Sequence, residues 1–178
     1  MATTKWVLDP THSEVEFKVK HLMISTVTGT FSSFSADVTT ENEDFTTAKV
    51  TFTADIASIN TKNEQRDGHL KSADFFDAAK FPQLTFVLTR IDNVDNDGSY
   101  NVHGDLTIRG TTKKVMMEVE FGGVIKDPWG NTRAGFTVSG KINRKEFGLA
   151  WHATTEAGGL VVSDDVRIHL ALEFVKGQ

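Results

Sequence analysis

Six histidines have the widest chemical repertoire in this sequence, but their spacing argues against catalysis or metal binding. They lie at His12, His21, His69, His103, His152 and His169. None belongs to an H-x-H or H-E-x-x-H motif, which would bring two imidazoles to one metal ion. The chain also has no cysteine, which excludes disulfides, thiolate metal sites and cysteine nucleophiles. We therefore expect no metal site.

Serine, glycine and carboxylate patterns supply no catalytic arrangement either. The chain has no G-x-S-x-G motif for an activated serine. Its glycine pairs, Gly122-Gly123 and Gly158-Gly159, lack the Lys-Ser/Thr that follows in a phosphate-binding loop. Neighbouring carboxylates such as Asp164-Asp165 have no spacing that sets two of them across a cleft. We expect no catalytic residue and no enzyme.

Three polar groups remain as candidate ligand contacts. Arg66 and His69 are three residues apart, so on one helical face they would offer donors to an anionic or carbonyl head group. Arg144 and Trp151 belong to a second basic and aromatic group, and His21 follows an apolar stripe and should point inward. Each has a structural alternative: a solvated helix with local ion pairs, a charged hairpin loop with aromatic packing, or a hydrogen-bonded core histidine.

Period-two alternation is the dominant pattern, and it predicts the strands that must position these side chains. In residues 13–21 the even positions are all Glu or Lys, whereas Val15, Phe17 and Val19 occupy odd positions. Together with this segment, similar stretches give about eight strands. The others are residues 27–38, 50–56, 84–88, 100–109, 115–121, 134–142 and 166–174.

The inward stripes are rich in phenylalanine. The chain has thirteen Phe but one Tyr and three Trp, and Phe brings apolar area without a polar group that needs a partner. Such an interior suits hydrocarbon rather than a sugar or nucleotide. A self-filled hydrophobic core would show the same enrichment, so composition does not separate a ligand cavity from a packed core.

One short helical segment is expected at about residues 61–76. Thr61-Lys62-Asn63-Glu64 resembles a capping box, and Gly68 costs the helix about 1 kcal/mol. The segment is either a solvated helix or a lid beside a cavity mouth.

The strand pattern predicts one all-β, antiparallel domain over residues 1–178. Eight strands with one apolar face must stack as two sheets or close into a barrel. Closure removes the exposed edges and leaves room for one small ligand. Periodicity leaves the β-sandwich open as an alternative.

Charge and hydropathy restrict the partners. With 19 Lys+Arg and 24 Asp+Glu the net charge is −5, so a basic surface for nucleic acid is not expected. The longest uncharged, mostly apolar run, residues 157–162, is far shorter than the roughly 18 residues of a membrane span, so we expect no membrane insertion. Residues 1–10 do not resemble a signal peptide. We expect a cytoplasmic protein, or a periplasmic one if a leader has been removed.

Taken in order, the motifs along nearly the whole chain resemble the YceI-like family, with Phe17 and His21 among them. The longer motifs are Trp6-x-x-Asp9-Pro10-x-His12-Ser13, Gly29-x-Phe31-x-x-Phe34, Ala57-Ser58-Ile59-Asn60-Thr61, Arg66-Asp67-x-His69-Leu70-Lys71-Ser72-x-Asp74-Phe75-Phe76-Asp77, Phe81-Pro82-x-Leu84-x-Phe86, Gly104-Asp105-Leu106-Thr107-Ile108-Arg109-Gly110-Thr111-Thr112-Lys113, Asp127-Pro128-x-Gly130 and Ile142-Asn143-Arg144-x-x-Phe147-Gly148-Leu149.

The resemblance implies a closed, eight-stranded, lipocalin-like barrel that holds a polyisoprenoid, prenyl quinone or similar long-chain lipid lengthwise. It also implies a homodimer. The residues expected to line the lipid tail are Val15, Phe17, Val19, Phe31, Phe52, Leu84, Phe86, Leu106, Val119, Phe136, Val138 and Leu170. Those expected at the head group or rim are His21, Arg66, His69, Arg144 and Trp151.

We therefore expect non-enzymatic binding, transport or storage of a long-chain isoprenoid, with no cofactor other than the bound lipid. One alternative is an enzyme that acts on such a lipid with His21 or His69 as the acid or base. Another is an empty barrel that serves as a stress-response or interaction scaffold.

Overall fold

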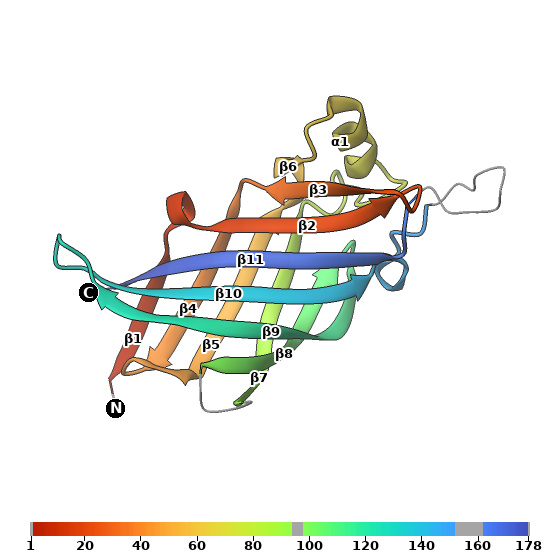
Figure 1. The fold of residues 1–178 in the computed structure, drawn as a ribbon. Helices are drawn as coiled ribbons and strands as arrows, with labels where there is room; N and C mark the ends of the chain where they lie inside the picture. The colour runs from red at the N-terminus through yellow and green to blue at the C-terminus, as the bar shows by residue number, and fades with distance from the viewer. Residues whose placement is uncertain (1, 94–97, 152–161, 178) are drawn as a thin grey trace.

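The computed structural model describes residues 2–93, 98–151 and 162–177, with Asn93 described by its backbone alone. One antiparallel sheet curves into a barrel (Figure 1). Its strands are β1 (Thr3–Leu8), β2 (Glu14–His21), β3 (Ser25–Phe31), β4 (Phe34–Glu41), β5 (Asp44–Asp55), β6 (Ile59–Asn60), β7 (Gln83–Asn93), β8 (Ser99–Ile108), β9 (Thr111–Lys126), β10 (Thr132–Asn143) and β11 (Asp165–Lys176). The helical elements are α1 (Glu64–Lys71) and the 3-10 turns η1 (Pro10–His12), η2 (Ile56–Ser58) and η3 (Arg144–Phe147).

The 11 strands occupy 8 positions around the barrel. Strands β1 and β2 both pair antiparallel with β11, so they are two parts of one long strand that η1 interrupts. Strands β3 and β4 are likewise two parts of one interrupted strand, because β3 pairs with β2 and β4 pairs with β1. Strands β5 and β6 are two parts of another, because β5 pairs with β4 and β6 pairs with β3. The prediction of a closed eight-stranded barrel is confirmed, and the β-sandwich is excluded.

Strand β1 closes the barrel, although period-two alternation does not predict a strand at residues 3–8. It pairs with β4 on one side and with β11 on the other. Thr4, Trp6 and Leu8 are buried between exposed neighbours, and the indole N–H of Trp6 donates to Thr40 Oγ1 at 3.0 Å. The exposed Val7 weakens the alternation of this short strand, so the pattern does not reveal it.

The helix is shorter than the expected span of residues 61–76. It begins after Asn63, whose side chain accepts from the backbone N–H of Arg66, and it ends before Ser72. Thr61 is not the cap, because its backbone N–H and its hydroxyl donate to Asp67 Oδ1 instead. Across the described ranges no helix is long and apolar enough to cross a membrane.

The two ends of the barrel are built differently (Figure 1). The α1 end carries the β2–β3 turn, residues 61–82, the β8–β9 turn and η3. The terminal end carries both chain termini and the β4–β5 and β9–β10 turns. At the terminal end an aromatic cluster fills the interior. It consists of Trp6, Phe45, Phe121, Phe136 and Phe174, with ring centroids 4.7 Å apart for Trp6–Phe45 and 4.9 Å for Phe45–Phe136.

Inward-facing glycines give large side chains room against the wall. A Cβ at Gly29 would lie 2.1 Å from Phe17 Cζ, and one at Gly104 would lie 2.4 Å from Phe86 Cζ and 2.5 Å from the Val87 carbonyl oxygen. Both glycines occupy inward positions of their strands. The neighbouring Phe rings therefore lie over the glycine backbone, on the inner face of the wall.

Gly104→Ala is expected to destabilise the barrel by about 1–3 kcal/mol, the usual cost of overpacking. The strain is hard to relieve because the new Cβ would meet the backbone carbonyl of Val87 as well as the Phe86 ring. Gly135→Ala is the matched control, since a Cβ there meets nothing within 4 Å. Urea unfolding of both variants measures the difference, and equal stabilities would contradict this packing argument.

Candidate functional site

The barrel encloses an apolar cavity of about 290 Å³. Ligand pockets typically range from about 300 to 1,000 Å³, so this cavity is near the lower end of that range. Its wall comes from the inward stripes of the strands together with the segment around α1. Among the described residues, only two charged ones border it, Glu16 and Arg144, and the Glu16 carboxylate lies 3.6 Å from Lys18 Nζ.

All twelve residues expected to line a lipid tail border this cavity. They are Val15, Phe17, Val19, Phe31, Phe52, Leu84, Phe86, Leu106, Val119, Phe136, Val138 and Leu170. Their common placement follows from strand geometry, because alternate side chains point to the same face. That they contact a lipid stays a prediction.

Other cavity residues were not expected from the sequence. Phe45 and Ala48 of β5 border the cavity, as do Leu70, Phe75 and Phe76 around α1. The register of β4 and β5 shifts between Thr39 and Glu41, which breaks the alternation that could have revealed Phe45. No period-two pattern exists in the segment around α1, so its contribution depends on how that segment folds back.

Arg144 lies at the α1 end of the cavity, but backbone carbonyls already occupy most of its donors. The side chain is 3% exposed. Its Nε donates to Ser163 O at 2.9 Å, and Nη1 donates to Leu149 O at 2.5 Å and Trp151 O at 2.7 Å. Burial lowers the pKa of the guanidinium, and Asp164, 3.8 Å from Nη2, partly offsets this. Arg144 therefore joins residues 149–151 to Ser163.

The structure brings His69 and Trp151 together. Their rings meet edge to face with centroids 4.9 Å apart, and His69 Nε2 lies 2.8 Å from Asp74 Oδ2. Trp151 also packs against Phe75, and the Arg144 guanidinium lies 5.9 Å from the Phe75 ring. Among the expected rim residues, His69, Trp151 and Arg144 thus share one packed group at the α1 end.

Arg66 and His21, the other two expected rim residues, lie outside the packed group of His69, Trp151 and Arg144. Arg66 Nε donates to Thr61 Oγ1 at 2.8 Å and Nη2 donates to Thr61 O at 2.6 Å, so this side chain fastens the start of α1. His21 is half-buried and forms a backbone bridge with Val162. Neither residue borders the cavity. Their role as head-group contacts stays a prediction.

Arg109 fastens the cover of the α1 end. From the β8–β9 turn, its Nη1 donates to Gly148 O at 2.5 Å and its Nη2 donates to Ala73 O at 2.9 Å. These bonds join the segment after α1 to the segment after η3. Leu70, Phe75 and Phe76 are held against the cavity beneath them.

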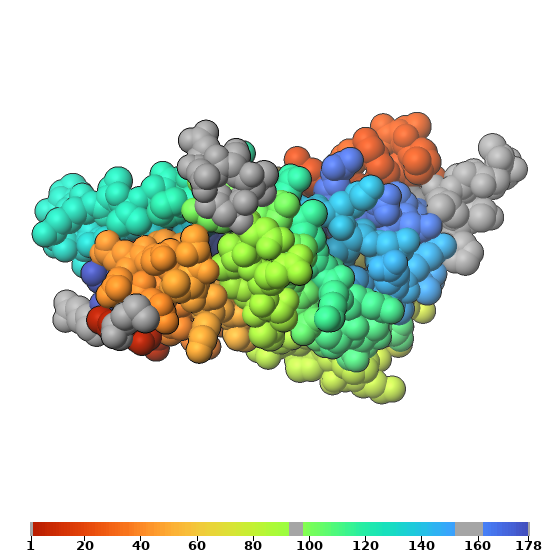
Figure 2. Space-filling model, turned by 90° about the horizontal axis from the view of Figure 1, so that it is seen from below, coloured from red at the N-terminus to blue at the C-terminus, as the bar shows by residue number. Residues whose placement is uncertain are grey.

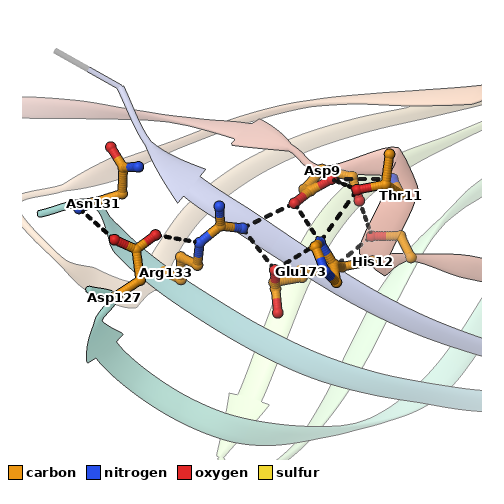
Figure 3. Close-up of polar contacts among 8 residues, drawn as sticks. Asp9, Thr11, His12, Asp127, Asn131, Arg133 and Glu173 are labelled. Atoms are coloured by element: carbon orange, nitrogen blue, oxygen red, sulfur yellow. Dashed lines mark hydrogen bonds and ion pairs between the residues drawn. The ribbon is translucent and has the colours of Figure 1, made fainter. Parts of the chain in front are cut away.

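An ionic cluster lies at the terminal end, outside the cavity (Figure 3). Oxygen and nitrogen atoms of Asp9, His12 and Glu173 lie within 4.8 Å of one another, which is compatible with a metal ion. However, Arg133 Nη1 already donates to Asp9 Oδ2 at 2.9 Å and to Glu173 Oε2 at 2.7 Å, and its Nε donates to Asp127 Oδ2 at 2.7 Å. The guanidinium supplies the positive charge, so we interpret the cluster as a structural tie between η1, β10, β11 and the β9–β10 turn.

The pKa values in this cluster follow from the same contacts. Hydrogen bonds from His12, Thr11 and Arg133 hold the pKa of the Asp9 carboxyl well below its usual range. The pKa of Asp127 is lowered by Arg133 and by the backbone N–H groups of Asn131 and Trp129. Asp127, Asp9 and Glu173 in turn raise the pKa of Arg133.

Sequence comparison finds close relatives over nearly the whole chain. The model of a family described as YceI-like domain matches residues 6–174. A UPF0312 protein of Staphylococcus aureus (strain USA300) is 42% identical over 172 residues, which cover 96% of this chain and 97% of that protein.

Solved structures share the barrel. The YCEI protein of Campylobacter jejuni has a TM-score of 0.77 at 36% identity, over 89% of this chain and 90% of that one. Burkholderia cenocepacia BcnA has a TM-score of 0.80 at 26% identity, over 93% and 98%. A polyisoprenoid binding domain from Saccharophagus degradans has a TM-score of 0.73 over 97% and 98%, and at 17% identity it shows the fold alone.

Arg144→Gln is expected to lower the free energy of unfolding of the ligand-free protein by about 2 kcal/mol or more. Glutamine is too short to replace the bonds to Ser163, Leu149 and Trp151, and each buried carbonyl left unpaired costs about 1–3 kcal/mol. Lys145→Gln, a change at the neighbouring half-exposed cation, is the control. Denaturant unfolding without lipid separates this structural role from a head-group role, which would leave ligand-free stability unchanged.

Asp9→Asn is expected to destabilise the protein by about 1 kcal/mol near pH 7, by weakening its hydrogen bond with the Arg133 guanidinium. Because the pKa of Asp9 is depressed by folding, its contribution is present above about pH 4 and is lost as the pH falls further. The stability difference between wild type and variant should therefore shrink in acid. Thermal unfolding between pH 3 and 7 measures it, with the exposed Asp37→Asn as control. A constant difference would contradict the proposed ionic tie.

Proposed function

The chain belongs to the YceI-like domain family, and from this we propose that it binds a long-chain lipid, such as an isoprenoid or a prenyl quinone, lengthwise in its barrel without chemical change. The observation that carries the proposal is the cavity, with an almost entirely apolar wall built from the inward side chains of the strands. The domain from Saccharophagus degradans, which is named for polyisoprenoid binding, has the same fold.

The energetics of such binding depend mainly on the tail. Each CH₂ group that moves from water into the cavity contributes about 0.8 kcal/mol. Ordering the chain offsets part of this gain. Because the wall contains few polar groups, affinity comes from hydrocarbon contact, and a head group with little polarity needs no dedicated partner.

The positions of the histidines favour binding over catalysis. Neither His21 nor His69 borders the cavity, and His69 is engaged by Asp74 and Trp151. An acid or base must reach within hydrogen-bonding distance of its substrate. In the described part of the chain, these two candidates are therefore poorly placed to act on a lipid inside the barrel.

The physiological role follows as a proposal from the same cavity. A protein that shields one apolar chain from water can carry or store it. Assembly as a homodimer, a cytoplasmic location and a part in a stress response stay predictions.

Mass spectrometry of an organic extract, from protein purified without detergent, tests the proposed function. We expect a prenyl lipid, prenyl quinone or fatty lipid in near-stoichiometric amount, since the apolar wall is stabilised by an occupant. A blank extract from protein that also takes up no added lipid would contradict the proposal and favour an empty scaffold.

Leu170→Trp is expected to reduce lipid occupancy about tenfold, which corresponds to about 1.4 kcal/mol of lost affinity. Leu170 borders the cavity, so the larger ring takes space from the ligand. Ala171→Trp is the matched control, because the next residue of β11 points to the opposite face of the sheet. Lipid content per mole of folded protein is the measurement. Equal loss in both variants would place the ligand outside the barrel.

A further inference from the structure

The barrel wall is not hydrogen-bonded over its full height between β5 and β7. Their ladder runs only from Asp55, opposite Gln83, to Thr51, opposite Val87. Beyond that pair, the ladder partners of Asp44, Lys49 and Val50 lie in β4, and those of Leu88 and residues 90–93 lie in β8. The two strands therefore part toward the terminal end of the barrel.

Irregularities on both sides of this opening keep the strands apart. On β5, the Thr46 backbone N–H donates to Asp44 Oδ1 at 3.0 Å, and the Thr47 hydroxyl donates to Asp44 O at 2.6 Å. This turn coincides with the register shift between β4 and β5, and a second shift occurs in β7 between Leu88 and Arg90. Bulges bend strands and increase their local twist, so the separation is built into the wall.

The opening leads to the cavity. Ala48 and Val50 on the β5 side and Leu88 and Ile91 on the β7 side all border the cavity. In Figure 2, the orange surface of β5 and the green surface of β7 and β8 are separated by a narrow hollow, in which a dark-blue part of the chain is visible. The edges of the opening are thus apolar where they face the interior.

The described residues cover both ends of the barrel along its axis. At the α1 end, Leu70, Phe75 and Phe76 lie across the cavity, and Arg109 holds the segments above them. At the terminal end, the aromatic cluster of Trp6 and four phenylalanines fills the interior. Between these two covers, the β5–β7 opening offers a sideways route.

We propose that the opening between residues 44–50 and 88–93 is the portal through which the apolar tail of the ligand enters and leaves the barrel, sideways and tail first. The inference rests on the proposed function, because it concerns the route to the same cavity. A slim hydrocarbon chain fits a route between two strands, and bulky or strongly polar groups remain outside.

A portal controls rates rather than affinity, and this distinguishes it from the rest of the cavity wall. Narrowing it should slow uptake and release by the same factor, because both cross the same barrier. Widening it should accelerate both. A substitution elsewhere in the wall should change the affinity, mainly by changing the rate constant of release and not that of uptake.

Ala48→Trp narrows the portal, and we expect uptake of diphenylhexatriene, an apolar rod-shaped fluorophore, to slow about tenfold. Because Ala48 also borders the cavity, the affinity changes as well, and the uptake rate constant is the readout. The control Ala171→Trp places the same ring on the outside of β11. Stopped-flow fluorescence gives both rate constants. Circular dichroism checks that each variant is folded.

Leu88→Ala is a second test of the portal, and it remains informative if Ala48→Trp does not fold. It removes a side chain at the portal edge, so the uptake rate constant should rise about threefold. Leu170→Ala removes the same group from the wall away from the opening and should mainly speed release.

The outcomes separate the two proposals. Slower uptake in Ala48→Trp and faster uptake in Leu88→Ala, with the uptake rate unchanged in Leu170→Ala, would support the portal. Binding with rate constants unchanged at either position would overturn the portal and leave the proposed function intact. A wild-type protein that takes up no probe would contradict the proposed function, and the portal with it.

Discussion

Closure of the sheet through β1 is the constraint on which the rest of the structure depends. Side chains do not pack across the cavity of this barrel, so the hydrogen bonds between neighbouring strands must stabilise the wall there. Strand β1 pairs with β4 and β11 at once, and Trp6 fixes it to Thr40. Where η1 interrupts this long strand, the Ser13 hydroxyl donates to Asp9 O and accepts from the backbone N–H of Glu173. The break is therefore bridged rather than open.

The arginines show how the ends of the barrel are stabilised without filling its middle. Arg133 joins three carboxylates at the terminal end, whereas Arg109 and Arg144 donate to carbonyls of segments that cover the α1 end. A guanidinium suits this task because its donors spread in a fixed plane and reach several acceptors at once. The apolar lumen between the ends lacks van der Waals partners along its lining, and a lipid tail would supply them.

Residues that could contact a head group were the least predictable part of the candidate site. Arg66, His69 and Arg144 have the right chemistry, yet each is engaged by Thr61, Asp74 or backbone carbonyls. Residue type reports what a side chain can donate, but not which acceptor lies nearest. Those acceptors come from segments outside the regular strands, such as residues 61, 74 and 163.

The sequence by itself determined the class of the fold, the approximate strands and twelve of the side chains that border the cavity. It could do so because alternation is local: in a strand, each residue's side is decided by its neighbours. Tertiary structure alone decided the closing role of β1, the inward position of Phe45 after the β4–β5 register shift, and the separation of β5 from β7. It also decided which acceptors the arginines reach. These features depend on contacts between residues far apart in the chain, and no local pattern records them.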